Sequence, residues 1–302
     1  MEVLEMRKKR GGAALRFGLL ATLGAIGLIG AGAVMDTRAA AGGPGETTCF
    51  ECHGDQEESF AQTAHGRANL GAIGTARCEL CHGSGTAHAE SGGEAPILNP
   101  ATGPAEEVAD LCTRCHADNA AIQWQGSSHA EFDVSCASCH KLHAPWTNEK
   151  ALIRQETNDT CLSCHKTMRK TLYQRSSHPL RDGQMTCVDC HSPHGSAAEA
   201  SVAAITPNEK CYECHADKRG PYLFEHAPVR EDCMTCHDPH GSNQTMLLKT
   251  APPRLCQSCH LFGHHQTVPG TAGQVWNQNR SCVNCHSRIH GSNHPSGVIF
   301  MR

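Results

Sequence analysis

The chain has 302 residues, with 26 Lys and Arg against 30 Asp and Glu, which gives a formal net charge of −4. Hydrophobic residues make up 39% and aromatic residues only 4%, too few large side chains for the core of a globular protein of this length. The charge balance excludes the basic field of a nucleic-acid-binding protein, and the 20 regularly placed Cys and 22 His exclude a disordered chain. Something other than side chains must supply the interior.

Residues 1–41 have the pattern of a secretory signal peptide. Basic residues from Arg7 to Arg16 precede an uncharged run from Phe17 to Val34, and the small-residue sequence Ala39-Ala40-Ala41 follows. A retained membrane anchor is the alternative, because the run is close to the shortest span for a bilayer. Its glycines and the cleavage site favour removal by the Sec route. We therefore expect an exported mature domain of residues 42–302, in a compartment where thiols do not stay reduced by default.

Every cysteine belongs to a C-x-x-C pair that is followed directly by His, and these ten motifs are numbered here in chain order. The pairs are Cys49/Cys52, Cys78/Cys81, Cys112/Cys115, Cys136/Cys139, Cys161/Cys164, Cys187/Cys190, Cys211/Cys214, Cys233/Cys236, Cys256/Cys259 and Cys282/Cys285. The motif histidines are His53, His82, His116, His140, His165, His191, His215, His237, His260 and His286.

Three chemistries use paired cysteines in an exported chain: a disulfide framework, zinc sites and covalent attachment of c-type haem. Only haem attachment needs His beside every second Cys, because the two thiols add to the vinyl groups and that His becomes the proximal ligand of the iron. The sequence therefore predicts ten covalently bound haem c groups. Their apolar porphyrins would form the missing interior.

The motifs recur as a quasi-linear array, with steps of 22 to 34 residues between motif histidines. Segments 127–143, 176–194 and 224–240 repeat one another, which indicates two-haem units of about 50 residues. Frequent Pro and Gly predict mostly loops, and no apolar alternation predicts a sheet. We expect an elongated multihaem cytochrome c fold with little or no β structure and short α-helices at Glu106–His116, Gln155–Gln174 and Asn208–His215.

Twelve histidines lie outside the motifs and are candidates for the distal ligand of each iron. The predicted distal ligands are His65, His88, His129, His143, His178, His194, His226, His240, His265 and His290. His265 is preferred to its neighbour His264, and His290 to His294, because His290 and His240 share the sequence H-G-S-N. His143, His194 and His240 stand three residues after their own motif histidines, too near to reach the far face of the same porphyrin, so each is expected to bind the iron of another motif. Met168, Met185, Met234 and Met246 occupy no repeated position and are not expected to be ligands.

The sequences S-S-H-P-L-R-D-G, C-x-D-C-H-S-P-H-G-S and I-H-G-S-N-H-P-S-G, with ten motifs behind a signal peptide, resemble the MtrA/DmsE family of periplasmic decahaem cytochromes. The resemblance covers nearly all of the mature chain, and the pair His264-His265 departs from it. It implies a chain of bis-His haems in or against an outer-membrane β-barrel porin. The implied redox partners are an inner-membrane or periplasmic cytochrome and an outer-surface multihaem cytochrome or terminal reductase.

All-His coordination leaves no iron open to substrate, so the sequence favours electron relay across the outer membrane over catalysis. A soluble periplasmic shuttle that supplies a reductase is the alternative. A multihaem reductase fits less well, because enzymes of that class need an open haem and often a C-x-x-C-K motif, and every motif here ends in His.

Overall fold

The computed structural model describes residues 46–68, 77–117, 121–143, 151–261 and 280–301. The chain divides into two units, Met1–Ala41 and Gly42–Arg302, and all described residues belong to the second. The expected signal peptide, His264, His265, Trp146 and Trp276 lie outside the described residues. Among the described residues, no helix has the length and apolar character needed to cross a bilayer.

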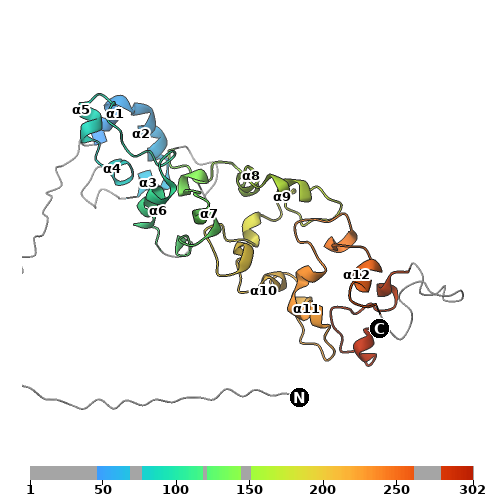
Figure 1. The fold of residues 1–302 in the computed structure, drawn as a ribbon. Helices are drawn as coiled ribbons and strands as arrows, with labels where there is room; N and C mark the ends of the chain where they lie inside the picture. Colours follow the sequence, from blue (N-terminus) through green and yellow to red (C-terminus); the bar gives the residue numbers. More distant parts are fainter. Residues whose placement is uncertain (1–45, 69–76, 118–120, 144–150, 262–279, 302) are drawn as a thin grey trace, which may run out of the picture. The chain divides into compact units, whose positions relative to one another are not determined.

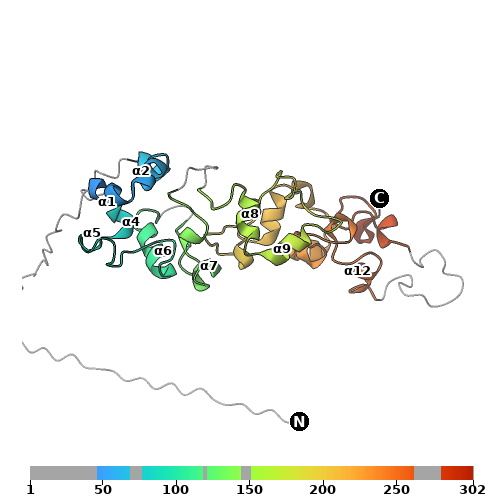
Figure 2. The same ribbon diagram turned by 90° about the horizontal axis from the view of Figure 1, so that it is seen from above.

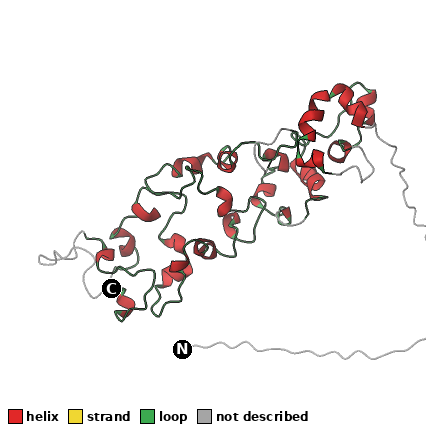
Figure 3. Cartoon of the chain, turned by 180° about the vertical axis from the view of Figure 1, so that it is seen from behind, coloured by secondary structure: helices red, strands yellow, loops and turns green. Residues whose placement is uncertain are grey.

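The described part of the chain consists of short helices joined by loops and turns, without a β-strand (Figure 3). The α-helices are α1 (Glu46–Cys52), α2 (Gly54–Ala61), α3 (Ala64–Arg67), α4 (Glu79–His82), α5 (Thr86–Glu90), α6 (Ala105–Thr113), α7 (Ser128–Glu131), α8 (Thr157–Leu162), α9 (Lys166–Thr171), α10 (Pro207–Tyr212), α11 (Ala227–Glu231) and α12 (Arg254–Gln257). Short 3₁₀ helices include η3 (Cys136–Ser138), η4 (Cys187–Asp189), η6 (Ala216–Lys218), η7 (Cys233–Thr235) and η9 (Cys282–Asn284). The predicted fold class, mostly loops with short helices and little or no β, is confirmed.

One of the three predicted helices is interrupted, and the other two form but end early. In place of one helix over Gln155–Gln174 the chain forms α8 and α9, because His165 leaves the helical region with ψ at 58°. His215 does the same after α10, with ψ at 44°. The third, predicted at Glu106–His116, is α6 and ends at Thr113. The helices therefore end within or just before their motifs, and the chain changes direction at the motif histidine.

The side-chain core is very small. Only Val108, Ala109, Trp124, Ala151, Leu162 and Leu172 are buried hydrophobic residues in the described part of the chain. This agrees with the shortage of large apolar residues in the composition.

The helices follow one another along the unit 42–302 in chain order. In two perpendicular views, α1 to α5 lie at one end of the described part and α12 lies near the other (Figures 1 and 2). Five isolated antiparallel bridges connect the loops: His140 with Leu152, His191 with Val202, His237 with Leu248, Ser176 with Ser242 and Phe224 with Ser292. The first three occupy one position of the repeat and the last two another, so the repeat seen in the sequence is also a repeat of structure.

Candidate metal centres

Each C-x-x-C-H motif folds as one helical turn. In all ten, the backbone N–H of the histidine donates to the carbonyl of the first cysteine four residues earlier, at 2.8 to 3.1 Å. Residues three and four apart lie on one face of such a turn. This spacing therefore presents two thiols and one imidazole to the same side, as attachment of a porphyrin and ligation of its metal require.

Nine motif histidines have a second imidazole beside them, with ring centroids 5.8 to 6.4 Å apart. The pairs are His53 with His88, His82 with His143, His116 with His65, His140 with His194, His165 with His129, His191 with His240, His215 with His178, His237 with His290 and His260 with His226. Two imidazoles bound to opposite sides of one metal ion by bonds of about 2 Å have centroids about 6 Å apart. These spacings fit an iron between each pair of rings.

The second ring of each pair is one of the predicted distal histidines, and it always comes from outside the partner's own motif. His143 lies beside His82, His194 beside His140 and His240 beside His191. Each partner belongs to the motif two before the one that the distal histidine follows in the chain. The distal ring precedes the motif in the chain for motifs 3, 5, 7 and 9, and follows it for motifs 1, 2, 4, 6 and 8. The tenth predicted distal histidine, His265, lies outside the described residues.

The contacts of His290 and His294 show which of the two lies beside a motif histidine. The ring of His290 lies 6.3 Å from that of His237. His294 uses its Nδ1 to accept a hydrogen bond from the backbone N–H of Ser296 at 3.1 Å. A neutral ring that accepts at Nδ1 carries its proton on Nε2 and cannot bind a metal there.

Backbone carbonyls fix the tautomer of many of these imidazoles. A carbonyl oxygen can only accept, so a ring that contacts it through Nδ1 carries its proton there and presents a bare Nε2. The contacts, at 2.6 to 3.1 Å, join His82 to Leu98, His88 to Ala95, His129 to Pro193, His178 to Pro239, His191 to Ala200, His226 to Ile289, His237 to Met246 and His286 to Ile299. Such a partner orients a metal-bound imidazole and raises its basicity.

Burial also favours the neutral ring. It lowers the pKa of His65, His143, His194, His226, His240 and His290, in each case reinforced by a neighbouring histidine or cation. The unprotonated imidazole is the form that binds a metal.

Strained turns supply some of these carbonyls. The oxygen that accepts from His191 belongs to Ala200, and the oxygen that accepts from His237 belongs to Met246; both residues have left-handed φ angles, of 55° and 56°. A left-handed conformation costs a residue with a side chain about 1–2 kcal/mol. The same turn therefore occurs twice at one position of the repeat, where it aims a carbonyl at a motif histidine.

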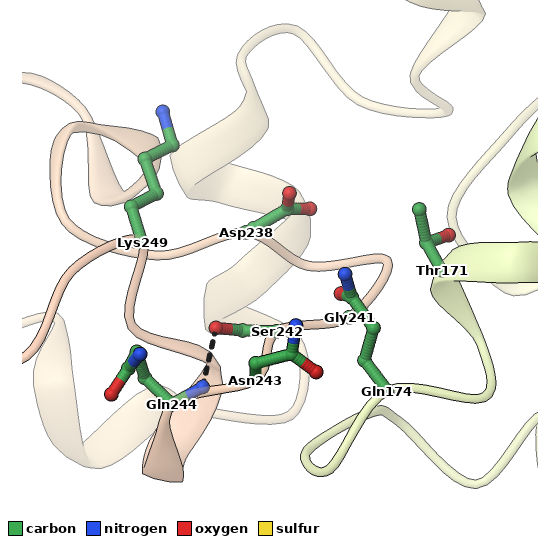
Figure 4. A pocket seen from close by; sticks show the side chains of 8 residues that line it. All are labelled: Thr171, Gln174, Asp238, Gly241, Ser242, Asn243, Gln244 and Lys249. Carbon is green, nitrogen blue, oxygen red and sulfur yellow. Dashed lines mark hydrogen bonds between the residues drawn. The ribbon is translucent and has the colours of Figure 1, made fainter.

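Successive two-haem units pack against each other through the sequence H-G-S, which begins with a distal histidine. A Cβ atom on Gly195 would lie 2.4 Å from the carbonyl oxygen of Gln123, so only glycine allows this approach. One unit later, Gly241 and Ser242 pack in the same way against Thr171 and Ser176. Figure 4 shows this seam, where a polar cavity of about 300 Å³ lies between the 171–174 and 238–249 segments.

Two asparagines that sequence reasoning missed join consecutive motifs. Asn208 donates to the carbonyls of Val229 and Arg230, and its Oδ1 accepts from the backbone N–H of Cys233 at 2.8 Å. Asn158 makes the equivalent contacts, including one with the N–H of Cys187 at 2.8 Å. Each stands three residues before the first cysteine of its motif, and alignment of these two positions in the sequence would have revealed them.

From motif 2 to motif 10, the cysteines of consecutive motifs lie near enough to shift one another's pKa. The thiols present here stand where thioether sulfurs would lie after haem attachment. Hydrogen bonding between the thiols of Cys112 and Cys136 raises the pKa of the former and lowers that of the latter to about 7. Cys161 and Cys187 form the same pair, and the thiols of Cys211 and Cys233 and of Cys256 and Cys282 also hydrogen bond.

The second cysteines of motifs 2, 4, 6 and 8 interact with the cysteines of the next motif and complete the series. Burial raises the pKa of the Cys139 thiol, and the adjacent Cys161 and Cys164 thiols raise it further. Cys81 interacts in the same way with Cys115, Cys190 with Cys211 and Cys214, and Cys236 with Cys259. Consecutive motifs from the second to the tenth are therefore close neighbours.

The two cysteines of a motif are not equally covered. The first cysteine of every motif is half-buried, but the second is exposed in six motifs: Cys52, Cys115, Cys164, Cys214, Cys259 and Cys285.

Cys285 stands apart at the end of the row of motifs. Its backbone N–H donates to the carbonyl of Cys282 at 3.2 Å, which keeps it on the turn of motif 10. Motif 10 meets motif 9 through Cys282 and Cys256, and among the described residues Cys285 makes no such link to another motif. The geometry of the turn suits Cys285 for haem attachment, and that role stays a prediction.

The motif turns, the paired imidazoles and the loop-rich fold define a multihaem c-type cytochrome. The family model for a doubled CXXCH motif matches residues 129–170, 178–220 and 226–262. The chain is 41% identical over 273 residues to the multiheme cytochrome MtrA of Shewanella baltica, which covers 85% of this chain and 81% of that protein. It is 27% identical over 112 residues to the cytochrome c-type protein NrfB of Escherichia coli, over 33% of this chain and 58% of that protein. The chain belongs to the MtrA family of multihaem cytochromes. It is an electron-transfer protein with covalently bound haem c.

Proposed function

We propose that the mature chain, residues 42–302, carries ten haem c groups and relays electrons along them in the order of the motifs. The twenty motif cysteines attach the haems, the ten motif histidines are the proximal ligands, and the ten predicted distal histidines, His265 included, complete the coordination. Each bound haem supplies a one-electron Fe(III)/Fe(II) couple. The proximity of each motif's cysteines to those of the next, from Cys81 to Cys282, carries this proposal.

The protein's own residues perform three tasks in this relay. The motif turns hold neighbouring attachment points together, so transfer proceeds between adjacent centres. Paired imidazoles occupy both axial positions and keep substrates away from the iron. Where a backbone carbonyl lies at Nδ1, it holds the ring in its ligating tautomer and influences the potential of that centre.

A count of haems and spin states tests this proposal. A pyridine haemochrome assay and the intact mass of the mature protein are expected to give ten haems per chain, on a polypeptide that begins after Ala41. Electron paramagnetic resonance of the oxidised protein is expected to show low-spin ferric haem only. Fewer than ten haems would refute the assignment of all ten motifs, and a stoichiometric high-spin ferric haem would favour a multihaem reductase.

We further propose that the exported chain works in the periplasm inside or against an outer-membrane β-barrel porin. It would accept and deliver electrons between an inner-membrane or periplasmic cytochrome and an outer-surface multihaem cytochrome or terminal reductase. Membership of the MtrA family supports this arrangement. Extraction of native membranes in detergent is expected to yield the chain with a barrel protein; recovery as a free monomer from periplasm and membranes alike would favour the soluble shuttle.

A further inference from the structure

The Nδ1 atom of His143 has a different kind of partner from the Nδ1 atoms of four other distal histidines. His88, His129, His178 and His226 donate to backbone carbonyls. His143 instead contacts a side chain, the Oε1 of Gln56, at 3.0 Å, from a segment 87 residues away in the sequence. A substitution leaves the backbone carbonyl in place, but it can remove a side-chain partner. The role of the Gln56 contact can therefore be tested directly.

The orientation of the Gln56 amide is determined by its neighbour. Its Nε2 donates to a carboxylate oxygen of Asp55 at 2.7 Å, which leaves Oε1 toward His143. An amide oxygen accepts and does not donate, so Nδ1 of His143 carries the proton and Nε2 is bare. The ring of His143 lies 5.9 Å from that of His82, the motif histidine of the second motif.

One face of α2 makes this contact. Gln56 and Phe60 are four residues apart, and residues with that spacing lie on the same side of a helix. The Phe60 ring lies 5.6 Å from that of His143. Phe60 also contacts Arg77, whose guanidinium lies 5.8 Å from the centre of the Phe60 ring. His143 is therefore held by a hydrogen bond and an aromatic contact from the helix that directly follows motif 1.

We infer that Gln56 is a positioning residue that holds His143 in its ligating tautomer and thereby lowers the reduction potential of the haem bound at His82. This inference rests on the proposed function, which makes His82 and His143 ligands of one iron. An acceptor at Nδ1 makes the imidazole a stronger donor to the metal, and a stronger donor stabilises the ferric state. The Asp55 carboxylate strengthens the effect because its charge polarises the amide.

The same contact connects the first two centres. Gln56 stands three residues after His53, the motif histidine of motif 1, and reaches the distal ring of the second centre. The link therefore precedes the row of cysteine interactions that begins at motif 2.

The experiment compares four variants of the full haem-loaded chain by potentiometric titration followed optically and by electron paramagnetic resonance. In Gln56→Leu, one haem of the set is expected to move to a more positive potential and its low-spin g values to change. In Gln56→Glu, which keeps an acceptor and adds a negative charge, that haem is expected to move to a more negative potential than in the unchanged protein. Gln62→Leu is the matched control, because Gln62 is an exposed glutamine just beyond α2. Its titration and spectrum are expected to match those of the unchanged protein.

His143→Ala separates this inference from the proposed function. One haem is expected to become high-spin in that variant. If no high-spin haem forms, His143 is not a ligand and both proposals fall at this centre. If a high-spin haem does form and Gln56→Leu and Gln56→Glu both leave the titration and the g values unchanged, the role assigned to Gln56 is wrong and the ligand assignment stands.

Discussion

Replacement of Asn208 by Ala removes the side chain that joins motifs 7 and 8. The residue is only 7% exposed, and three hydrogen bonds disappear with it: two to the carbonyls of Val229 and Arg230 and one from the N–H of Cys233. Each is worth about 1 kcal/mol, so the free energy of unfolding of this region should fall by about 3 kcal/mol. The exchange of the Cys233 amide hydrogen should then accelerate by about 10²-fold.

Hydrogen exchange read by mass spectrometry on peptides that contain Cys233 measures this change. Asn158→Ala should produce the same acceleration at Cys187, because the two asparagines make equivalent contacts. Asn243→Ala is the control, since that side chain is exposed and its loss should change the stability by less than about 0.5 kcal/mol. Unchanged exchange at Cys233 in Asn208→Ala, or a change equal to that of the control, would refute the reasoning.

Three further results are expected. Gly195→Ala should lower the free energy of unfolding by about 1–3 kcal/mol in denaturant titration, because its Cβ would lie 2.4 Å from a backbone oxygen, whereas Gly54→Ala, with nothing within 4 Å, should be neutral. His194→Ala should convert one low-spin haem per chain into a high-spin haem that binds carbon monoxide; difference spectra that show no carbon monoxide binding would contradict the ring pairing. The Nδ1 of His65 is buried without a partner, so its haem should have a potential about 40 mV above that of a centre whose ring makes this hydrogen bond. His65→Ala should therefore remove low-spin absorbance from the high-potential part of a redox titration and His129→Ala from a lower part; the reverse order would contradict this.

The helical turns of the motifs could be predicted from the sequence, because they depend on local spacing. A C-x-x-C-H motif places its three functional side chains on one turn wherever that turn lies. The expectation that His143, His194 and His240 bind irons of other motifs also followed from spacing alone, since three residues cannot span a porphyrin.

The surroundings of the rings could not be predicted, because they are made by groups without a sequence signature. Any residue supplies a carbonyl, so nothing marked Ala95 and Leu98 as acceptors for His88 and His82 in a loop that lacks Cys and His. Gln56 is 87 residues from His143, and a single sequence holds no record of that proximity. The break at His165 was missed because helical propensity does not register a change of backbone direction at a single residue.

The alternating direction of the ring pairs has a consequence for maturation. In a chain that crosses a membrane with its N-terminus first, the second imidazole for motifs 3, 5, 7 and 9 has already emerged when the motif arrives. Motifs 1, 2, 4, 6 and 8 must wait until a later stretch of polypeptide has been delivered; for His140 the wait lasts until His194. These five centres would pass through a stage with one imidazole and an open position for small ligands, and an arrest of export between residues 53 and 290 would leave at least one of them in that state.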